Sequence, residues 1–283
     1  MSRHELRKTF GEDAELYDRV RPSYPTSLYD DLAALLGNPV RPRVLEIGCG
    51  TGQATTPMVR RGWSVQAVEL SPELAAVARN KQPELEVITA AFEDWPLPAE
   101  RFDLVLSATA FHWIDPEVRV VKSADALRPG GVLAVVSTHH VAGGSQSLFE
   151  SVQDCYPRFM PGTPKGLQLE PADAVQDDPG EFDASGRFGE VEFRRYEWEQ
   201  QYTTAEYLDL LSSYSGHRAL AADARDGLYG CIAALIEADG GRITKRYLTQ
   251  LTAATVLYQG LALGRSTGQD PDYGHLRGTT EVH

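Results

Sequence analysis

The residues best suited to chemistry lie in a glycine-rich stretch and in an acidic residue that follows it. The stretch VLEIGCGTGQ (residues 44–53) places Gly48, Gly50 and Gly52 directly after a short apolar run. Glycines leave the backbone bare, so a ligand can approach it closely. Glu69 ends the next apolar run, where a carboxylate can accept hydrogen bonds from both hydroxyls of a ribose. The loop and the acid together predict a site for a ribose-containing ligand.

The spacing of this loop argues against a phosphate ligand. Its pattern is G-x-G-x-G, whereas the dinucleotide fingerprint is G-x-G-x-x-G and the phosphate-binding loop requires G-x-x-x-x-G-K-[ST]. Position 53 is Gln and no Lys follows it, so both phosphate patterns lack a defining residue.

Three histidines and a tryptophan follow later apolar runs. His112 and Trp113 come after the fourth run, and His139 and His140 come after the fifth. A neutral imidazole at such an edge can act as a general base, so each of the three histidines is a candidate catalytic residue. The alternative is that Trp113 forms a wall and His112 makes a local hydrogen bond. Because side chains alternate along a strand, we expect only one of His139 and His140 to face the substrate.

The elements that position these residues alternate between short strands and helices. Strands are predicted over residues 43–47, 64–70, 85–89, 102–107 and 132–137, with helices near 53–61, 72–81 and 116–127 between them. Ser71 and Pro72 provide an N-cap and a first helical residue. Apolar strands joined by helical crossovers indicate a parallel sheet covered on both faces, hence a doubly wound α/β fold.

The remaining segments flank this pattern. Helices are expected before residue 40, where Tyr17, Arg21 and Tyr24 form a polar and aromatic group that either packs as a helix face or closes over a ligand. After residue 140, helices are expected near 146–156 and 203–238 and strands over 189–201 and 246–257. Arg158 lies among the aromatic residues of this region and would support an anionic substrate if it pointed inward.

Composition and charge limit the class of protein. The chain has 283 residues, 42% of them hydrophobic, and a net charge of −13 from 40 acidic and 27 basic side chains. This charge would repel nucleic acid and acidic lipid headgroups, so neither is an expected partner. The cysteines, Cys49, Cys155 and Cys231, form no CxxC pair, and we expect reduced thiols, no disulfide and no metal site. The charged N-terminus and the lack of a long apolar run predict a cytoplasmic protein without a membrane span.

Five segments together resemble a known family. In order and spacing, VLEIGCGTG, AVELS, AAFEDWPL, FDLVLSATAFHWID and LRPGGVLAV are similar to the successive motifs of class I S-adenosylmethionine-dependent methyltransferases. The stretch AFHW resembles in particular the small-molecule branch that includes the trans-aconitate methyltransferases. The resemblance covers residues 44–136. It implies a doubly wound, seven-stranded, mostly parallel sheet of order 3-2-1-4-5-7-6 with a helical cap.

The resemblance also implies roles for individual residues. Glu69 would bind the ribose, Glu46 would lie near the amino group of the cofactor, and the Phe92 amide would meet adenine. Many members of the family have Asp where this chain has Ala91, so a neighbour such as Glu93 or Asp94 is expected to replace that carboxylate. The full set expected to bind the cofactor is Tyr17, Arg21, Glu46, Gly48, Cys49, Gly50, Gly52, Glu69, Leu70, Ala91, Phe92, Glu93 and Ala108. The acceptor is expected to contact Tyr24, Trp113 and Arg158.

The expected organisation is a lid over residues 1–40, a cofactor-binding core over 41–140, a cap with the last two strands over 141–263, and a loose tail over 264–283. The expected reaction is methyl transfer to a carboxylate or hydroxyl of a small molecule. A nicotinamide-dependent oxidoreductase and a non-catalytic cofactor-binding protein are the alternatives. The sequence carries no indication of the oligomeric state.

Overall fold

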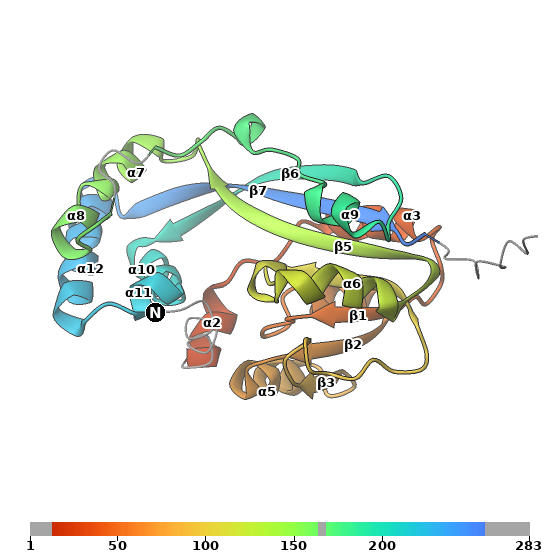
Figure 1. Cartoon of the computed structure of the whole chain (residues 1–283). Helices are drawn as coiled ribbons and strands as arrows, with labels where there is room; N and C mark the ends of the chain where they lie inside the picture. The colour runs from red at the N-terminus through yellow and green to blue at the C-terminus, as the bar shows by residue number, and fades with distance from the viewer. Residues whose placement is uncertain (1–12, 164–167, 258–283) are drawn as a thin grey trace, which may run out of the picture.

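The computed structural model describes residues 13–163 and 168–257, which form one sheet covered by helices and extended by a helical cap (Figure 1). The predicted tail and the first twelve residues of the predicted lid lie outside this range. The seven strands have the order β3-β2-β1-β4-β5-β7-β6, which confirms the predicted topology. The strands are β1 (Arg43–Ile47), β2 (Ser64–Glu69), β3 (Glu86–Thr89), β4 (Phe102–Ala108), β5 (Leu127–Val141), β6 (Glu192–Thr203) and β7 (Arg242–Thr255).

The strands from β3 to β5 are parallel, and β7 runs antiparallel between β5 and β6. The central strands are buried on both faces, which explains their continuous apolar sequences. One face packs on α6 (Pro116–Ala126) and α9 (Gly180–Ser185), and the other packs on α3 (Thr26–Leu35) and α4 (Thr55–Arg60). The helix α5 (Pro72–Lys81) covers β2 and β3.

Helix α5 begins where the sequence predicts. The Ser71 hydroxyl accepts a hydrogen bond from the amide of Leu74, and Pro72 occupies the first turn. This cap fixes the direction of the chain directly after Glu69, and it thereby fixes the end of β2 at the edge of the sheet.

The cap lies at one end of the sheet. It is built from one segment that precedes β6 in the sequence and one that follows it. Its elements gather around the ends of β6 and β7 (Figure 1), and they share a separate apolar core with these strand ends. They are α7 (Gln146–Gln153), α8 (Tyr156–Phe159), α10 (Thr204–Ser212), α11 (Ser215–Arg218) and α12 (Ala222–Ala238). The short helix α2 (Ala14–Val20) packs against α10 and α5, so it lies between the cap and the core.

Strand β5 is longer than predicted. The sequence predicts a strand over 132–137, whereas β5 continues to Val141 because β7 pairs with it over its whole second half, up to Val141 opposite Arg246. The last residue of β4, Ala108, pairs with Val136, so β5 and β7 overhang the neighbouring strand. His139 and His140 therefore lie within a strand and not after one.

The expectation of three free thiols is wrong for two of them. Cys155 precedes α8, Cys231 lies in α12, and the packing of these helices brings the two into a disulfide despite 76 residues of separation. No local spacing pattern predicts such a pair, because the helices meet only in the folded cap. Cys49 is a buried free thiol.

Candidate active site

A large cavity of about 570 Å³ opens at the carboxyl ends of the parallel strands. Its walls are formed by the glycine loop, the ends of β2 and β4, the overhang of β5 and β7, and the segment that follows α2. Ligands of open α/β sheets bind at this edge. The predicted residues that line the cavity are Tyr17, Arg21, Tyr24, Glu46, Gly48, Cys49, Gly50, Glu69, Leu70, Phe92, Ala108, His112, Trp113 and His140.

The glycine loop and Glu69 are joined directly. The amide of Gly50 donates to Oε2 of Glu69 at 2.9 Å, and the amide of Ser71 donates to Oε1 at 2.8 Å. Gly48 has a φ of 72°, and a Cβ there would lie 2.5 Å from the Cβ of Ala110. The loop therefore requires glycine at this position. The carboxylate is held at the cavity wall by two backbone amides, in an orientation that does not depend on solvent.

Glu46 is a nearly fully buried carboxyl in the floor of the same cavity. Its exposed fraction is 1%, and its Oε2 accepts a hydrogen bond from the Thr55 hydroxyl at 2.6 Å. Burial raises the pKa of Glu46 to about 7, the Thr55 hydrogen bond opposes this shift, and the charge of Glu69 adds to it. A cationic ligand group beside Glu46 would stabilise its ionised form.

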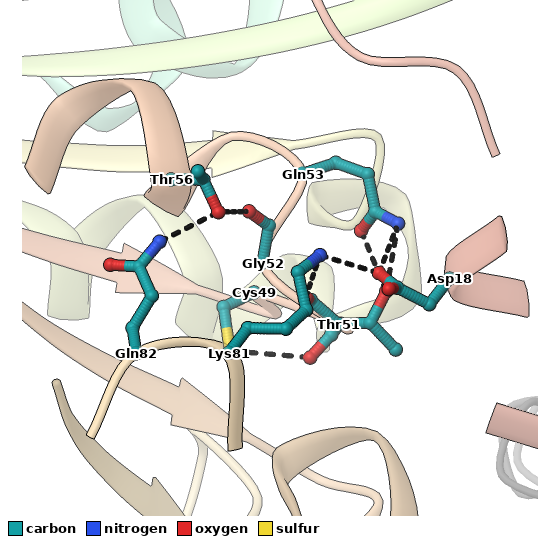
Figure 2. Close-up of polar contacts among 9 residues, drawn as sticks. Asp18, Cys49, Thr51, Gly52, Gln53, Thr56, Lys81 and Gln82 are labelled. Atoms are coloured by element: carbon teal, nitrogen blue, oxygen red, sulfur yellow. Dashed lines mark hydrogen bonds and ion pairs between the residues drawn. The ribbon is translucent and has the colours of Figure 1, made fainter. Parts of the chain in front are cut away.

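Helix α2 is fastened to the loop by a polar network (Figure 2). Lys81, at the end of α5, donates to Oδ1 of Asp18 at 2.6 Å and to the carbonyl oxygen of Thr51 at 3.0 Å. Gln53 donates to the same Asp18 oxygen at 3.2 Å and bonds to the Thr51 side chain. Gln53 occupies the position of the third glycine of the dinucleotide fingerprint, and here its side chain contacts Asp18 of α2.

A second set of contacts holds the segment after α2 over the cavity. The hydroxyls of Tyr24 and Thr109 are 2.8 Å apart, and Thr109 follows β4 with a φ of 56°, which is rare for a β-branched residue. The Arg21 guanidinium stacks on the rings of Tyr17 and Tyr214 and donates to the carbonyl oxygen of Ser213 at 3.0 Å. Its Nε is buried without a hydrogen-bond partner.

The far end of the cavity is formed by residues that the sequence pattern did not single out. Lys245 of β7 is 4% exposed and lies among aromatic rings, with Nζ 4.9 Å from the centre of the Tyr247 ring and 3.3 Å from the Tyr214 hydroxyl. Trp198 of β6 stacks on Tyr247 with ring centres 4.4 Å apart. The alternation of Lys245 and Tyr247 along a strand was the available signal, but the sequence alone does not show that β7 overhangs the site.

Five predicted site residues do not line this cavity. His139 lies on the opposite face of β5, because side chains alternate, and its Nε2 contacts the Ser137 hydroxyl at 2.9 Å. Arg158 is exposed on α8, with its guanidinium above the Phe159 ring. Glu93 turns toward α6, where it accepts a hydrogen bond from the amide of Asp115. The other two are Gly52, whose backbone closes the turn into α4, and Ala91, whose carbonyl oxygen accepts from Asp94 and Trp95.

The part of the chain that the structure describes holds neither a candidate metal centre nor a membrane-spanning helix. Over that range, no cluster of three or more His, Cys, Asp and Glu side chains is placed to hold a metal ion. Within the same residues, no helix is both long and apolar enough to span a membrane.

Comparison with known proteins identifies the core. Residues 45–135 match the family model of the methyltransferase domain. The chain contains a class I S-adenosylmethionine-dependent methyltransferase domain. This domain spans β1 to β5 and thus holds the glycine loop, Glu69 and the end of β4.

The methyltransferase domain has relatives in bacteria and yeast. An uncharacterized methyltransferase of Mycobacterium tuberculosis is 39% identical over 135 residues, which are 48% of this chain and 54% of the relative. The chain thus spans about half the length of the curated relatives it matches there. An uncharacterized methyltransferase-like protein of Schizosaccharomyces pombe is 27% identical over 74% of this chain and 78% of its own length. A solved structure assigned as a type II methyltransferase of Anaeromyxobacter dehalogenans shares the fold with a TM-score of 0.56, at 22% identity over 84% of this chain and 98% of that one.

The residues around the cavity, from the methyltransferase domain and from the segment that precedes it, are compatible with S-adenosylmethionine. Glu69 presents a carboxylate at the cavity wall that could accept hydrogen bonds from ribose hydroxyls, and Glu46 offers a carboxyl whose raised pKa a cationic amine would lower. The unpartnered Nε of Arg21 can donate to a carboxylate. At Gly50 the missing side chain keeps open the space between the loop and Tyr17, whose ring would lie 3.7 Å from a Cβ.

Proposed function

We propose that the chain catalyses methyl transfer from S-adenosylmethionine to an oxygen atom of a small molecule. The observation that carries the proposal is Glu69, held by the amides of Gly50 and Ser71 at the wall of the large cavity. This arrangement offers a carboxylate for a ribose, and the loop itself lacks the lysine of a phosphate-binding loop, which favours an adenosyl cofactor without phosphate groups.

In this proposal the cofactor lies along the glycine loop. Glu69 binds the ribose hydroxyls, Glu46 lies near the amino group, and Arg21 reaches the carboxylate across the loop. Phe92, buried at the end of β3, lies at the adenine end and packs against Trp95 in the core of that face. When bound, the cofactor would supply a methyl group activated by its sulfonium: the acceptor oxygen would form the new bond to this methyl group, and the sulfur would leave as a neutral thioether.

The contribution of the chain to such a reaction is positional. The cavity must hold the acceptor oxygen in line with the methyl group and exclude water, an effect that can be worth about 7 to 11 kcal/mol. The contacts of Tyr24 with Thr109 and of Asp18 with Lys81 close one side of the cavity over the loop. No nucleophile of the chain is needed for this displacement.

Two of the three candidate histidines favour a carboxylate acceptor over a hydroxyl, and His112, which also lines the cavity, remains the candidate base for a hydroxyl acceptor. His139 faces away from the cavity, and burial together with the charge of Lys245 lowers the pKa of His140 to about 3. An imidazole of such low basicity is a weak general base. A hydroxyl group that receives the methyl would need a general base to take its proton. A carboxylate arrives ionised, so its methylation requires no base.

The test is cofactor binding and methyl transfer with variants at Glu69. We expect Glu69→Ala to weaken binding of S-adenosylhomocysteine about tenfold to hundredfold in calorimetry, because the hydrogen bonds lost are to a charged group. Glu69→Gln should lose less, because the amide keeps one acceptor oxygen. Glu73→Gln is the matched control, since Glu73 lies four residues further on and is not part of the cavity lining.

Transfer itself is tested with S-adenosylmethionine carrying a labelled methyl group and a panel of carboxylic acids and alcohols. Labelled ester products would support the proposal. Tight cofactor binding without any labelled product would instead indicate a binding protein without methyltransferase activity, and preferential stabilisation by NAD would indicate an oxidoreductase.

A further inference from the structure

Lys245 is a buried cation that no carboxylate neutralises within the part of the chain that the structure describes. The side chain extends from β7 into the far end of the cavity, and only 4% of the residue is exposed. Its polar contact is the Tyr214 hydroxyl at 3.3 Å, and its ammonium lies 5.6 Å and 4.9 Å from the ring centres of Tyr214 and Tyr247. No carboxylate pairs with it within residues 13–163 and 168–257.

These contacts do not explain why a lysine occupies the position. An ammonium group moved from water into the interior loses its hydration, and a single hydrogen bond to a neutral hydroxyl and contacts with aromatic rings replace only part of it. A methionine would fill the same space without the desolvation cost. A cation retained in such a place is typical of a binding site.

The neighbouring groups respond to this charge. Burial and then Lys245 lower the pKa of His140 to about 3 and that of His217 to about 4. For Tyr214, burial raises the pKa of the phenol, but the charges of Lys245 and Arg21 together with hydrogen bonds from Lys245 and Tyr247 outweigh it, so the pKa is lowered. The Nε2 atom of His140 is also buried without a hydrogen-bond partner.

The two carboxylates and Lys245 lie at different ends of the cavity, and Arg21 lies between them, stacked on Tyr17 and Tyr214. Glu46 and Glu69 lie at the glycine loop, where a cationic sulfonium and amine would bind. Lys245 lies on β7, and β4 and β5 separate β7 from β1 in the sheet. At about 4.8 Å per strand this places Lys245 roughly 14 Å across the sheet from the loop strand. The cationic end therefore lies beyond the cofactor region, on the side where an acceptor enters.

We propose that Lys245 binds an ionised carboxylate of the methyl acceptor, with the Nε2 of His140 as a second polar contact. The inference rests on the proposed function and specifies its substrate class as carboxylic acids. The rings of Trp198, Tyr214 and Tyr247 form the walls around this carboxylate. They exclude water, so the attraction between ammonium and carboxylate is screened little.

The experiment compares carboxylates with their amides in calorimetric titrations of protein loaded with S-adenosylhomocysteine. The probes are phenylacetate against phenylacetamide and glutarate against glutaramide, each at up to millimolar concentration. In the wild type we expect at least one carboxylate to bind about tenfold to hundredfold more tightly than its amide. Lys245→Met should abolish that preference, and Lys245→Arg should keep part of it.

Two controls separate a binding role from a structural one. Arg246→Met removes a positive charge from the next residue of β7, whose side chain pairs with Glu197 and does not line the cavity, and it should leave the preference unchanged. Lys245→Met should unfold at the same temperature as the wild type or at a higher one, because it removes an uncompensated buried charge.

Three results would overturn the inference. They are an unchanged preference for carboxylate in Lys245→Met, a loss of S-adenosylhomocysteine binding in that variant, which would move Lys245 into the cofactor site, and failure of every carboxylate to bind the wild type. Methyl transfer to an uncharged alcohol would refute the inference while leaving the proposed function intact. Carboxylate binding at Lys245 without methyl transfer to any acid would refute the proposed function alone.

Discussion

Glu46 shows how the environment of a single residue makes a testable pH dependence. Its pKa of about 7 lies above the ordinary value of 4.5, so the folded protein holds a proton between these values that the unfolded chain releases. The stabilising contribution of Glu46 is complete below pH 4.5 and is lost as the pH rises through 7. The ionised form costs stability because the carboxylate has lost its hydration.

We therefore expect a difference between the wild type and Glu46→Gln that changes with pH. Without cofactor, the free energy of unfolding of the wild type relative to this variant should fall by up to about 3 kcal/mol between pH 4.5 and 7. Urea denaturation at several pH values measures it. His140 and His217, whose lowered pKa values act in the opposite sense, are present in both proteins and cancel. A difference that does not vary with pH would show that Glu46 titrates normally.

At this scale the sequence predicts some residues and misses others for a physical reason. The glycine spacing and Glu69 are local signals, because the loop and the strand end are adjacent along the chain or in the sheet. Lys245 is notable because it is buried, and the sequence does not show this burial. The end of β7 is buried by α10 and α11, which precede β7 by many residues in the chain. The position of Arg158 also depends on how the cap folds. It lies on an exposed face of α8, outside the cavity lining, and not at the predicted substrate site.

At the scale of elements, α2 is held on the glycine loop mainly through Asp18 and Lys81. The pair is partly exposed, with side-chain exposures of 25% and 35%, so its own contribution to stability is modest. Because Lys81 also holds the Thr51 carbonyl, loosening α2 should disturb the loop backbone that faces the cofactor.

We expect Lys81→Ala to weaken S-adenosylhomocysteine binding about twofold to tenfold, the effect of losing roughly 0.5 to 1.4 kcal/mol. Asp18→Ala should have a similar effect, and the double variant should lose less than the sum. Arg194→Ala, which breaks an exposed ion pair with Glu192 on β6, is the control and should bind as the wild type does. Calorimetry measures all four, and additive losses would show that the two residues act independently.

The disulfide between α8 and α12 gives a second element-scale prediction. Closing a loop over a sequence separation of 76 residues is worth about 4 kcal/mol in the chain-entropy model. Reductant should lower the free energy of unfolding by this order in urea, and the variant in which Cys155 and Cys231 are both alanine should be insensitive to reductant. Thiol titration of the denatured protein should find only Cys49 before reduction. Three reactive thiols before reduction would show that the bond does not form.

The length of elements was harder to predict than their order. Ser71 and Pro72 fix the start of α5 locally, and the structure places it there. Strand β5 extends past its apolar core into Thr138, His139 and His140, which are polar enough to suggest a loop. Only the pairing with β7, which comes about a hundred residues later, keeps them extended.

For the whole molecule, the net charge of −13 opposes the local charge at Lys245. An anionic acceptor must approach a negative protein before it reaches a buried cation, and salt screens the long approach more than the short buried contact. We expect the association rate of phenylacetate with cofactor-loaded protein to rise about twofold as the ionic strength increases from about 0.01 to 0.15 M. Stopped-flow fluorescence of the cavity tryptophans measures it. Phenylacetamide is the control, and a rate for phenylacetate that falls with salt would contradict the argument.

The topology of the whole sheet was predictable, whereas the cap was not. Five apolar runs separated by helices restrict the core to a doubly wound sheet, because each strand must be buried on both faces. The family resemblance then supplied the order of the last strands. The cap has no such repeat, and its disulfide and its packing on β6 and β7 arise from contacts between segments far apart in the chain.

The length of the overhang of β5 and β7 determines how far Lys245 lies from the glycine loop. His140 lies four residues beyond Val136, the last partner of β4, which is about 14 Å along a strand. A strand can be shortened by two residues without exchanging its buried and exposed faces. Such a change in β5 and β7 would move the ammonium group of Lys245 about 7 Å toward the glycine loop. The length of β5 and β7 would then set the length of the acid that fits between Lys245 and the cofactor. Related chains with identical cofactor sites could therefore select acids of different length by gaining or losing pairs of residues in these two strands.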